Sequence, residues 1–406
     1  MPMPLTPPPF PATGLPVAEA LPRLCEALRQ GTGAILEAPP GAGKTTLVPL
    51  ALLGEEWLGG GKILVLEPRR LAARMAARRM AELLGEEVGQ TVGYRVRMES
   101  KVGPATRIEV ITEGILTRRL IEDPELAGVG AVIFDEFHER GIHTDLGLAL
   151  CLEAREALRE DLRILVMSAT LDGTAVASLM GDAPVIASEG RVFPVETRHL
   201  DRPEPRGIDR AMAVAIRAML REEDGSILAF LPGEGEIRRV QALLGEADLG
   251  PNVRIAPLFG ALLARDQDAA VRPAPPGLRK VVLATDIAET SLTIEGIRIV
   301  IDGGYRRKPR FDPQSGMTRL ETRRVSRAGA DQRRGRAGRL EPGICCRLWP
   351  EAETAALARF ETPEIMEADL APLALDLARW GVTDPAELRW PDPPPAARYA
   401  RAQELL

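Results

Sequence analysis

The sequence predicts an α/β protein made of two tandem domains with parallel sheets, followed by a small C-terminal region. Short apolar runs, each followed by a turn or the start of a helix, recur along the chain, and stretches with helical spacing separate them. Such alternation of buried strands and helices is typical of a parallel sheet covered on both faces. A chain of 406 residues is longer than the usual length of a domain with a single hydrophobic core, so two or three domains are expected.

Composition narrows the class of protein. Hydrophobic residues make up 45% of the chain and charged residues 27%, as in soluble globular proteins. The net charge of −6 gives no global attraction to nucleic acid, although a local basic groove can coexist with an acidic whole. The proline-rich start, 1–14, lacks the basic and apolar parts of a signal peptide and is expected to be a disordered leader. No apolar run is long enough to suggest a membrane span.

The four cysteines, Cys25, Cys151, Cys345 and Cys346, have no metal-ligand spacing, and two of them are adjacent. Neighbouring residues of a strand point to opposite faces, so we interpret all four as free thiols. Free thiols indicate a reducing compartment, and we expect a cytoplasmic protein.

The first domain is predicted at 15–192. Its expected strands lie in GAILEAPPG (33–41), KILVLEPRR (62–70), RIEVITEGI (107–115), AVIFDE (131–136) and RILVMSAT (163–170). Between them, LAARMAARRMAELLG (71–85) has the spacing of a helix with one apolar face.

The second domain, 193–358, repeats this pattern without repeating the sequence. Its expected strands lie in SILAFLPG (226–233), VRIAPLFG (253–260), KVVLATDI (280–287) and IRIVIDGG (297–304). The segment 304–324 alternates around a DPQSG turn and predicts a β-hairpin. In the last region, 359–406, residues 363–381 have helix-like periodicity, and the chain stops inside a further helix, as if cut from a longer protein.

The segment APPGAGKTT (38–46) follows one expected strand and opens a helix. It matches the phosphate-binding loop pattern except that Ala38 replaces the first glycine. In such a loop, glycines turn backbone N–H groups onto a polyphosphate, a lysine meets the outer phosphates and a threonine holds Mg²⁺. The candidate nucleotide-binding residues are Gly41, Ala42, Gly43, Lys44, Thr45 and Thr46. An ordinary glycine turn before a helix is the alternative.

The stretch AVIFDEFH delivers acidic residues to the end of a buried strand. In open parallel sheets, ligands bind at the carboxyl ends of the strands, which would place Asp135 and Glu136 beside the phosphate loop. Asp135 would then hold the hydration shell of Mg²⁺ together with Thr45, and Glu136, also close to the metal, would orient and deprotonate the attacking water. A solvated turn would also explain these charges, and His138 taken alone would more often be structural than catalytic.

Seven motifs in this order carry a resemblance to a known family: GAGKT, EPRR, TEGIL, DEFH, SAT, ATDIAETSLTIEGI and QRRGRAGR. Together they resemble the superfamily 2 helicases of the DEAH/RHA group and, within that group, the bacterial HrpB-type helicases. The resemblance runs from about Leu15 to the end of the chain. It implies two RecA-like domains that bind ATP between them, with Mg²⁺, and single-stranded RNA lying across both. The region 359–406 would be the start of a winged-helix domain.

The resemblance also implies roles for individual residues. Gln332, Arg336 and Arg339 would face the triphosphate and complete the catalytic set with Glu136, although a flexible basic RNA-binding segment is the alternative. His138, together with Ser168 and Thr170, would link the nucleotide site to the SAT motif. Asp286 and Arg79 would contact the nucleotide, and Arg79 would do so by stacking on the base.

Residues of the other motifs are expected to contact the nucleic-acid strand. Arg69, Arg70, Thr112, Gly114 and Thr285 would contact phosphates and sugars, which gives affinity with little base specificity. For each of them, a helix cap or an ordinary loop is an equally good interpretation when it is taken singly. The resemblance implies that the hairpin separates the strands of a duplex or holds the RNA in register, and a plain surface hairpin is the alternative.

The sequence thus predicts an ATP-dependent RNA helicase core that moves 3′ to 5′ on single-stranded RNA or on an RNA duplex with a 3′ overhang. The use of other NTPs stays open, since no motif that reads adenine is evident. Two alternatives stay open as well: a DNA helicase or translocase of the same superfamily, and a nucleotide-gated RNA-binding switch that does not unwind. No membrane association is expected, and the sequence names no protein partner.

Overall fold

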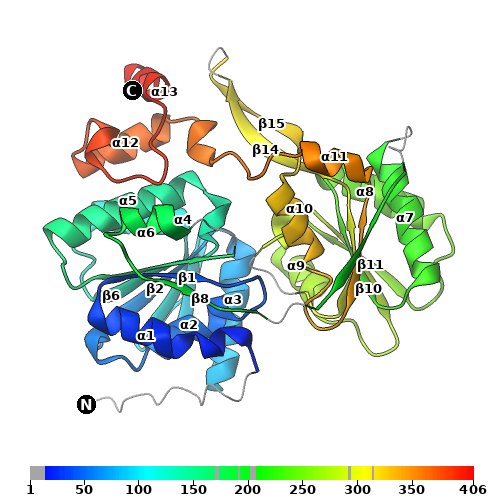
Figure 1. The fold of residues 1–406 in the computed structure, drawn as a ribbon, viewed down its shortest axis with the longest axis horizontal. Coiled ribbons are helices and arrows are strands. Elements are labelled where there is room, and N and C mark those ends of the chain that lie inside the picture. The colour runs from blue at the N-terminus through cyan, green and yellow to red at the C-terminus, as the bar shows by residue number, and fades with distance from the viewer. Residues whose placement is uncertain (1–13, 170–172, 191–192, 202–206, 291–293, 313–314) are drawn as a thin grey trace. The chain divides into compact units, whose positions relative to one another are not determined.

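The computed structural model of the protein describes residues 14–169, 173–190, 193–201, 207–290, 294–312 and 315–406. The chain divides into two units, which are shown in Figure 1. Unit 1 comprises Met1–Gly190 and Thr362–Leu406, and unit 2 comprises Arg191–Glu361. The predicted leader, 1–14, lies outside the described residues except for Gly14.

Unit 1 is built on an eight-stranded sheet with the order β4-β3-β5-β2-β6-β7-β1-β8. Its strands are β1 (Gly33–Glu37), β2 (Lys62–Glu67), β3 (Val92–Val96), β4 (Glu99–Lys101), β5 (Ile108–Thr112), β6 (Val129–Phe134), β7 (Arg163–Ser168) and β8 (Val185–Ala187). All neighbours pair in parallel except β3 and β4, which form an antiparallel edge. The central strands are runs of Val, Ile and Leu, as a sheet buried on both faces requires.

Helices cover both faces of this sheet, with α1, α2 and α3 on one side and α4, α5 and α6 on the other (Figure 1). The helices are η2 (Pro16–Glu19), α1 (Leu21–Gln30), α2 (Lys44–Leu52), η3 (Glu56–Leu58), α3 (Arg70–Leu84), α4 (Glu113–Glu122), η4 (Phe137–Glu139), α5 (Ile142–Ala157) and α6 (Gly173–Leu179). Two apolar clusters, one on each face, form the core. Each fully buried Leu or Ile there contributes about 1.5–3 kcal/mol.

Unit 2 is built on a six-stranded sheet with the order β11-β12-β10-β13-β16-β9, in which all neighbours pair in parallel. Its strands are β9 (Val195–His199), β10 (Ser226–Phe230), β11 (Val253–Leu258), β12 (Arg279–Ala284), β13 (Ile297–Asp302) and β16 (Gly343–Arg347). Its helices are α7 (Ile208–Glu222), α8 (Glu234–Gly245), α9 (Ala264–Val271), η5 (Asp286–Ala288), α10 (Arg327–Arg334) and α11 (Glu351–Ala356).

The predicted hairpin is present in unit 2 as a separate two-stranded ribbon. Strands β14 (Tyr305–Asp312) and β15 (Met317–Arg324) pair antiparallel, with Tyr305 opposite Arg324 and Asp312 opposite Met317. The predicted strands of both domains and the helix at 71–85 are confirmed. The sequence analysis did not identify β3, β4, β8 and β9, which are short strands at or near sheet edges and therefore lack a long apolar run.

The C-terminal residues, which the sequence assigned to a third region, pack on unit 1. They form η6 (Glu364–Met366), α12 (Ala371–Trp380), η7 (Pro385–Glu387) and α13 (Ala396–Leu405). Ile365, Leu373 and Leu377 join the apolar cluster that α4 and α5 form on their face of the sheet. Residues 359–406 are all described and contain no strand, so a winged-helix domain stays a prediction.

All four cysteines are buried free thiols, as the sequence analysis expected. Burial raises the pKa of Cys25 to about 11, because a thiolate would lose its hydration there. Among the described residues, no helix has both the length and the apolar character to cross a membrane.

Candidate functional site

The phosphate loop joins β1 to α2 in the conformation that the sequence predicts. Gly41 and Gly43 have φ angles of 84° and 89°, a region that side chains rarely adopt. At Gly43 a Cβ atom would also lie 2.8 Å from Cδ1 of Leu15. Both the backbone conformation and the close approach of Leu15 therefore favour glycine at this position. Thr46 donates its hydroxyl to the carbonyl of Gly43 at 3.2 Å. The start of α2 thus follows the loop directly, and a phosphate held in the loop would accept hydrogen bonds from the first N–H groups of this helix.

Lys44 is the first residue of α2, and its side chain is buried beside two carboxylates. Its Nζ lies 3.1 Å from Oε1 of Glu136 and 3.9 Å from Oδ1 of Asp135. Burial alone would lower the pKa of Lys44, but the charges of Glu136 and Asp135 outweigh it and raise this pKa. The ammonium therefore stays charged. The predicted convergence of the phosphate loop with the acidic strand end is present.

Asp135 contacts the helix that follows the phosphate loop. Its Oδ2 accepts a hydrogen bond from Oγ1 of Thr45, and its Oδ1 accepts from the N–H of Glu136 at 2.8 Å. Burial raises the pKa of Asp135, while Lys44 and Thr45 oppose that change. A hydroxyl and a carboxylate in contact are the hard oxygen ligands that Mg²⁺ prefers, and Mg²⁺ usually adds waters and phosphate oxygens to them. The donor set at Thr45 and Asp135 fits this ion.

Glu136 and His138 lie in the turn after β6. Glu136 has a left-handed backbone, with φ 48°, and is buried. The N–H of Ala169 donates to Nδ1 of His138 at 3.3 Å, and Oγ of Ser168 lies 3.4 Å from the same nitrogen. Because a backbone N–H can only donate, Nδ1 is the acceptor, and the proton of a neutral ring lies on Nε2. Nε2 in turn lies 3.5 Å from Oε2 of Glu136.

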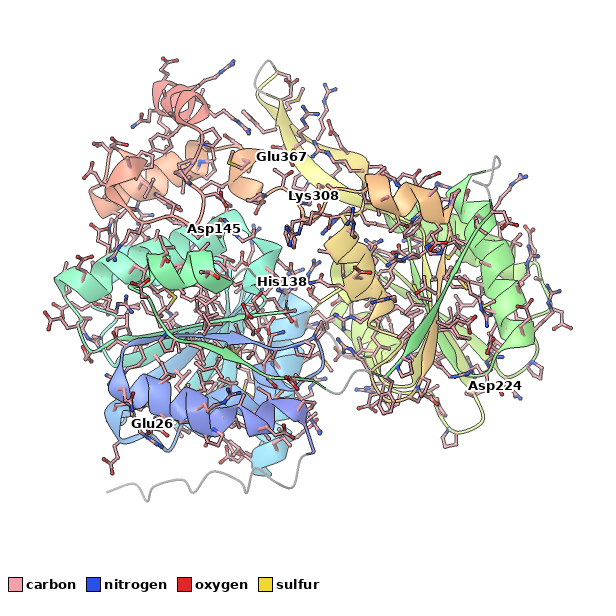
Figure 2. All side chains as sticks on the ribbon, in the orientation of Figure 1. Glu26, His138, Asp145, Asp224, Lys308 and Glu367 are labelled. Carbon is pink, nitrogen blue, oxygen red and sulfur yellow. The ribbon has the colours of Figure 1, made fainter. Side chains whose placement is uncertain are left out.

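His138 thus bridges Glu136 to the end of β7, where the SAT motif begins. This contact agrees with the link that the family resemblance implies for His138 and Ser168. Thr170, the third residue of that prediction, lies outside the described residues. Figure 2 marks His138 in unit 1.

Glu67 is a further acidic residue of this site that the sequence analysis missed. It ends β2, the neighbour of β6 in the sheet, and is fully buried. Its charge adds to those that raise the pKa of Lys44. The segment EPRR was interpreted through its arginines alone. The signal that could have revealed Glu67 is the one used for Asp135, an acid at the end of a buried parallel strand.

The nucleic-acid candidates of unit 1 lie at the starts of two helices. Arg69 precedes α3, and its Nη2 lies 3.2 Å from Oε2 of Glu139, while Arg70 is exposed. Thr112 occupies the N-cap position of α4, but its side chain makes no capping hydrogen bond. Gly114 is exposed, and a Cβ atom there would meet nothing within 4 Å. These two residues therefore present an open surface at the start of α4.

The arginine-rich motif of unit 2 spans α10 and the loop after it. Gln332 and Arg336 are buried, and Arg339 is half-buried. Arg336 donates from Nε to the carbonyl of Glu289 at 2.9 Å, which fixes its guanidinium against the segment after η5. A basic run this buried and this well bonded is not the flexible arginine-glycine segment considered as the alternative.

Arg333, between these residues, has a structural position that the sequence did not predict. It is 1% exposed, donates to Asp302 at 2.8 Å and to Glu289 at 3.0 Å, and stacks on the ring of Phe230. Two acids beside one buried guanidinium satisfy its charge. Arg333 therefore anchors α10 to β10 and β13, and this anchor orients the neighbouring Arg336.

Two candidates in unit 2 lie at η5. Thr285 occupies its N-cap position without a side-chain capping bond, and its N–H donates to the carbonyl of Leu258 at 3.1 Å. Asp286 pairs with Arg306 of the hairpin at 3.0 Å. Arg79, the candidate for stacking on the base, lies on the exposed side of α3 and pairs with Glu82 at 3.3 Å.

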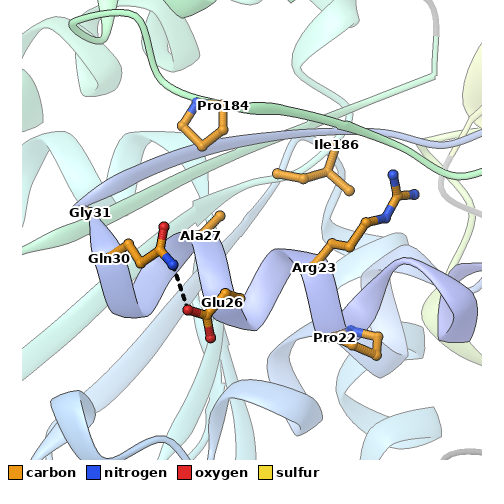
Figure 3. Close-up of a pocket in the computed structure, with 8 residues that line it drawn as sticks. All are labelled: Pro22, Arg23, Glu26, Ala27, Gln30, Gly31, Pro184 and Ile186. Atoms are coloured by element: carbon orange, nitrogen blue, oxygen red, sulfur yellow. Dashed lines mark hydrogen bonds between the residues drawn. The ribbon is translucent and has the colours of Figure 1, made fainter.

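Unit 1 also has a groove of about 630 Å³ between α1 and the edge strand β8 (Figure 3). Pro22, Ala27, Pro184 and Ile186 form much of its lining, and a hydrogen bond of 2.6 Å joins Gln30 to Glu26 at one side. None of the predicted site residues lines this groove.

Comparisons with known proteins agree with this geometry. The family model for DEAD/DEAH box helicases matches residues 18–179, and the model for the helicase conserved C-terminal domain matches residues 210–341. The chain is 54% identical over 394 residues to the ATP-dependent RNA helicase HrpB of Escherichia coli, covering 97% of this chain and 48% of that protein. It is 39% identical over 400 residues to the pre-mRNA-splicing factor ATP-dependent RNA helicase prp22 of Schizosaccharomyces pombe, covering 97% of this chain and 34% of that protein.

A crystal structure of the Escherichia coli DEAH/RHA helicase HrpB matches with a TM-score of 0.92 and 54% identity over 97% of this chain and 50% of that one. The similarity confirms two tandem RecA-like domains with mostly parallel sheets. This chain spans about half the length of the curated HrpB and about a third of the splicing factor. The motifs, the two family models and the structural match lead to one conclusion: the chain belongs to the DEAD/DEAH box helicases, in their DEAH/RHA group.

Proposed function

We propose that this chain is the core of an ATP-dependent RNA helicase that couples NTP hydrolysis to 3′-to-5′ movement along single-stranded RNA. The observation that carries the proposal is the convergence of Lys44, Thr45, Asp135 and Glu136 at one edge of the first sheet. An ammonium, a hydroxyl and two carboxylates around a phosphate loop are the groups that phosphoryl transfer to water requires. The similarity to proteins named RNA helicases supports the choice of partner.

In this proposal, the backbone of Gly41–Thr46 cradles the phosphates and Lys44 neutralises the outer ones. Mg²⁺ bound at Thr45 and Asp135 would offset charge on the phosphate oxygens. Glu136 accepts the proton of the attacking water, a role that its contact with Lys44, the residue assigned to the outer phosphates, supports. His138 keeps Glu136 oriented through Nε2.

The second unit contributes cationic groups to the same reaction. Arg336 and Arg339 stabilise charge that develops on the terminal phosphoryl group, and Gln332 and Asp286 take part in holding the nucleotide. The anchoring of Arg336 to the carbonyl of Glu289 supports this role, because a pre-oriented guanidinium loses little freedom when it meets the phosphate.

The nucleic-acid strand is assigned to Arg69, Arg70, Thr112, Gly114 and Thr285. Uncapped threonines and an exposed glycine at helix starts leave hydroxyl and N–H groups for phosphates and sugars. Such contacts carry no base specificity, which suits a motor that moves along any sequence.

The test is the rate of hydrolysis of ATP, GTP, CTP and UTP by the purified chain with Mg²⁺, alone and with single-stranded RNA or DNA of equal sequence. Stimulation by RNA over DNA is expected, since a 2′-hydroxyl contact distinguishes the two. Greater stimulation by DNA would favour the DNA translocase. A duplex with a 3′ overhang, followed under single-turnover conditions, tests unwinding. Nucleotide-dependent RNA binding without strand separation would favour the gated binding switch.

A further inference from the structure

The loop that leads from the catalytic carboxylates to α5 carries contacts that the proposed reaction does not use. Glu113 lies between two of the nucleic-acid candidates, Thr112 and Gly114. Its Oε1 accepts a hydrogen bond from Oγ1 of Thr144, a buried residue in the first turn of α5. A Cβ atom on Gly141 would lie 3.0 Å from Oε2 of Glu113 and 3.2 Å from its Oε1. The carboxyl of Glu113 therefore rests directly on this loop.

The loop is stiff between that contact and the catalytic carboxylate. The N–H of Glu139 donates to the carbonyl of Glu136 at 2.9 Å, that of Arg140 donates to Phe137 at 3.1 Å, and that of Thr144 donates to Gly141 at 3.1 Å. Glu136 and Arg140 both have left-handed backbones, with φ angles of 48° and 51°. A turn held at both ends in this region has few alternative conformations, so a displacement at Gly141 reaches Glu136.

A second nucleic-acid candidate contacts the same loop. Arg69 pairs with Glu139 at 3.2 Å, and the partners are about one-fifth exposed. Two separate strand-binding motifs thus each contact the turn that carries Glu136 and His138. A plain surface loop would not require either contact.

The C-terminal residues of unit 1 hold the other side of the loop. The N–H of Glu364 donates to the carbonyl of Arg140 at 3.1 Å, and Oε2 of Glu364 accepts from the N–H of Ile142 at 3.0 Å. Arg140 also donates to Asp145 and to Asp392. The C-terminal residues therefore hold the loop on both sides of Gly141, so the carboxyl of Glu113 contacts a segment with little freedom of its own.

We infer that Glu113 is a positioning residue which, through Thr144 and Gly141, transmits the presence of single-stranded RNA at Thr112 and Gly114 to Glu136. Glu113 thereby sets the RNA dependence of hydrolysis and leaves the unstimulated reaction unchanged. The inference rests on the proposed function and adds to it the path by which the nucleic acid regulates the nucleotide site. Each contact along this path lies inside unit 1.

The test uses Thr144→Val, which removes the hydroxyl that Glu113 accepts and nearly preserves side-chain shape. We expect unstimulated hydrolysis and the KM for ATP to match those of the wild type, while stimulation by single-stranded RNA falls about fivefold or more. Thr144→Ser restores a hydroxyl and should restore stimulation. Thr117→Val is the matched control, because Thr117 is a buried threonine of α4 and its hydroxyl has no hydrogen-bond partner among the described residues.

A second readout does not depend on hydrolysis. By thermodynamic linkage, a non-hydrolysable ATP analogue must change the affinity for RNA by the same factor by which RNA changes the affinity for the analogue. Fluorescence anisotropy of labelled RNA, with and without the analogue, measures this coupling factor. In Thr144→Val this factor should move toward one, and in Thr117→Val it should stay. Equal coupling in both variants and the wild type would overturn the inference. A wild-type chain that binds RNA and analogue with coupling but hydrolyses no nucleotide would instead refute the proposed function.

Discussion

The ammonium of Lys44 lies 3.1 Å from Oε1 of Glu136, although 92 residues separate the two in the sequence. One group comes from the start of the helix after β1 and the other from the turn after β6, and the parallel sheet brings both to the same edge. The charges of these two buried carboxylates outweigh the effect of burial on the pKa of Lys44, so the ammonium stays charged until a polyphosphate enters. The ammonium can then exchange carboxylate oxygens for phosphate oxygens.

Replacement of this ammonium should therefore abolish the reaction. Lys44→Ala removes the cation that meets the outer phosphates and leaves Asp135 and Glu136 buried without it. We expect no hydrolysis above background in a steady-state phosphate-release assay. Lys101→Ala, at an exposed lysine of β4, is the control and should keep the wild-type rate. Turnover by Lys44→Ala at a similar rate would show that the phosphates bind elsewhere.

Glu136→Gln separates binding from chemistry. The amide keeps the shape of the side chain but cannot accept a proton from water, so turnover should slow by about 10²-fold or more while nucleotide affinity stays within a few fold. Single-turnover hydrolysis and equilibrium binding of a fluorescent ATP analogue measure the two quantities. Glu82→Gln, at a half-exposed carboxylate of α3, should change neither. A loss of affinity in Glu136→Gln would assign this carboxylate to binding and not to catalysis.

The contribution of Arg336 to hydrolysis should depend on the shape of its guanidinium group and not only on its positive charge. Its Nε donates to the carbonyl of Glu289, and a planar guanidinium can meet a phosphate as a fork through two nitrogens at once. Arg336→Lys keeps the charge but cannot form both contacts, so kcat should fall about 10²–10³-fold with little change in nucleotide affinity. Arg334→Lys is the matched control, because Arg334 is 45% exposed in the same motif. A wild-type kcat for Arg336→Lys would exclude Arg336 from the reaction.

Much of the site could be predicted because its signals are local. The phosphate loop is a contiguous pattern, and Asp135 and Glu136 follow a run of apolar residues that only a buried strand explains. The tie between His138 and Ser168 could not be derived from the residues themselves, since it depends on two strand ends 30 residues apart. The family resemblance implied it, and the roles proposed for Arg336 and Arg339 come from the same resemblance.

Other features depend on tertiary packing that produces no periodic pattern in the sequence. The contact of Glu113 with Gly141 depends on where α4 lies relative to the loop, which the sequence alone does not reveal. The sequence analysis assigned residues 359–406 to a separate C-terminal region, because an amphipathic helix does not reveal which surface covers its apolar face. The edge strand β8 has only three residues, and β9 is mostly polar, so neither shows an alternating pattern.

Arg140 has two acidic partners that differ in burial, and the difference predicts unequal energies. Asp145 is fully buried and receives two hydrogen bonds from Arg140, whereas Asp392 is about half exposed (Figure 2 marks Asp145). Arg140→Ala leaves the buried carboxylate without its cation and should lower the free energy of unfolding by about 3–5 kcal/mol. Asp392→Asn should cost about 1 kcal/mol or less, because water screens that pair.

Urea unfolding of the full chain, followed by circular dichroism, measures both values. Arg140→Ala removes both contacts, whereas Asp392→Asn removes only the one with the C-terminal residues. Equal losses in the two variants would contradict the ranking, since they would mean that the internal contact with Asp145 adds nothing to stability.

Glu361 should make the stability of unit 2 depend on acid pH. Its carboxylate contacts Lys308 at 2.9 Å and Arg306 at 3.3 Å and accepts from the N–H of Ser326 at 2.9 Å. Burial would raise the pKa of Glu361, but Arg306 and Lys308 outweigh it and lower this pKa to about 2, from an ordinary value of 4.5. Because the folded-state pKa is the lower one, the stabilisation is complete above pH 4.5 and is lost as the pH falls toward 2.

Glu361→Gln removes this titration, so the comparison with wild type isolates it from the other carboxylates. At pH 7 the variant should be less stable by about 1–3 kcal/mol, a range reduced from the full pKa shift because the side chain is partly exposed. The difference should shrink steadily between pH 5 and pH 3 in urea unfolding, with amide exchange in β14 and β15 showing where it arises. Glu353→Gln, which breaks the more exposed pair with Arg324, is the control and should differ from wild type by a smaller amount at pH 7. A Glu361→Gln difference that stayed constant down to pH 3 would show that the carboxylate stabilises the hairpin by packing and not by its charge.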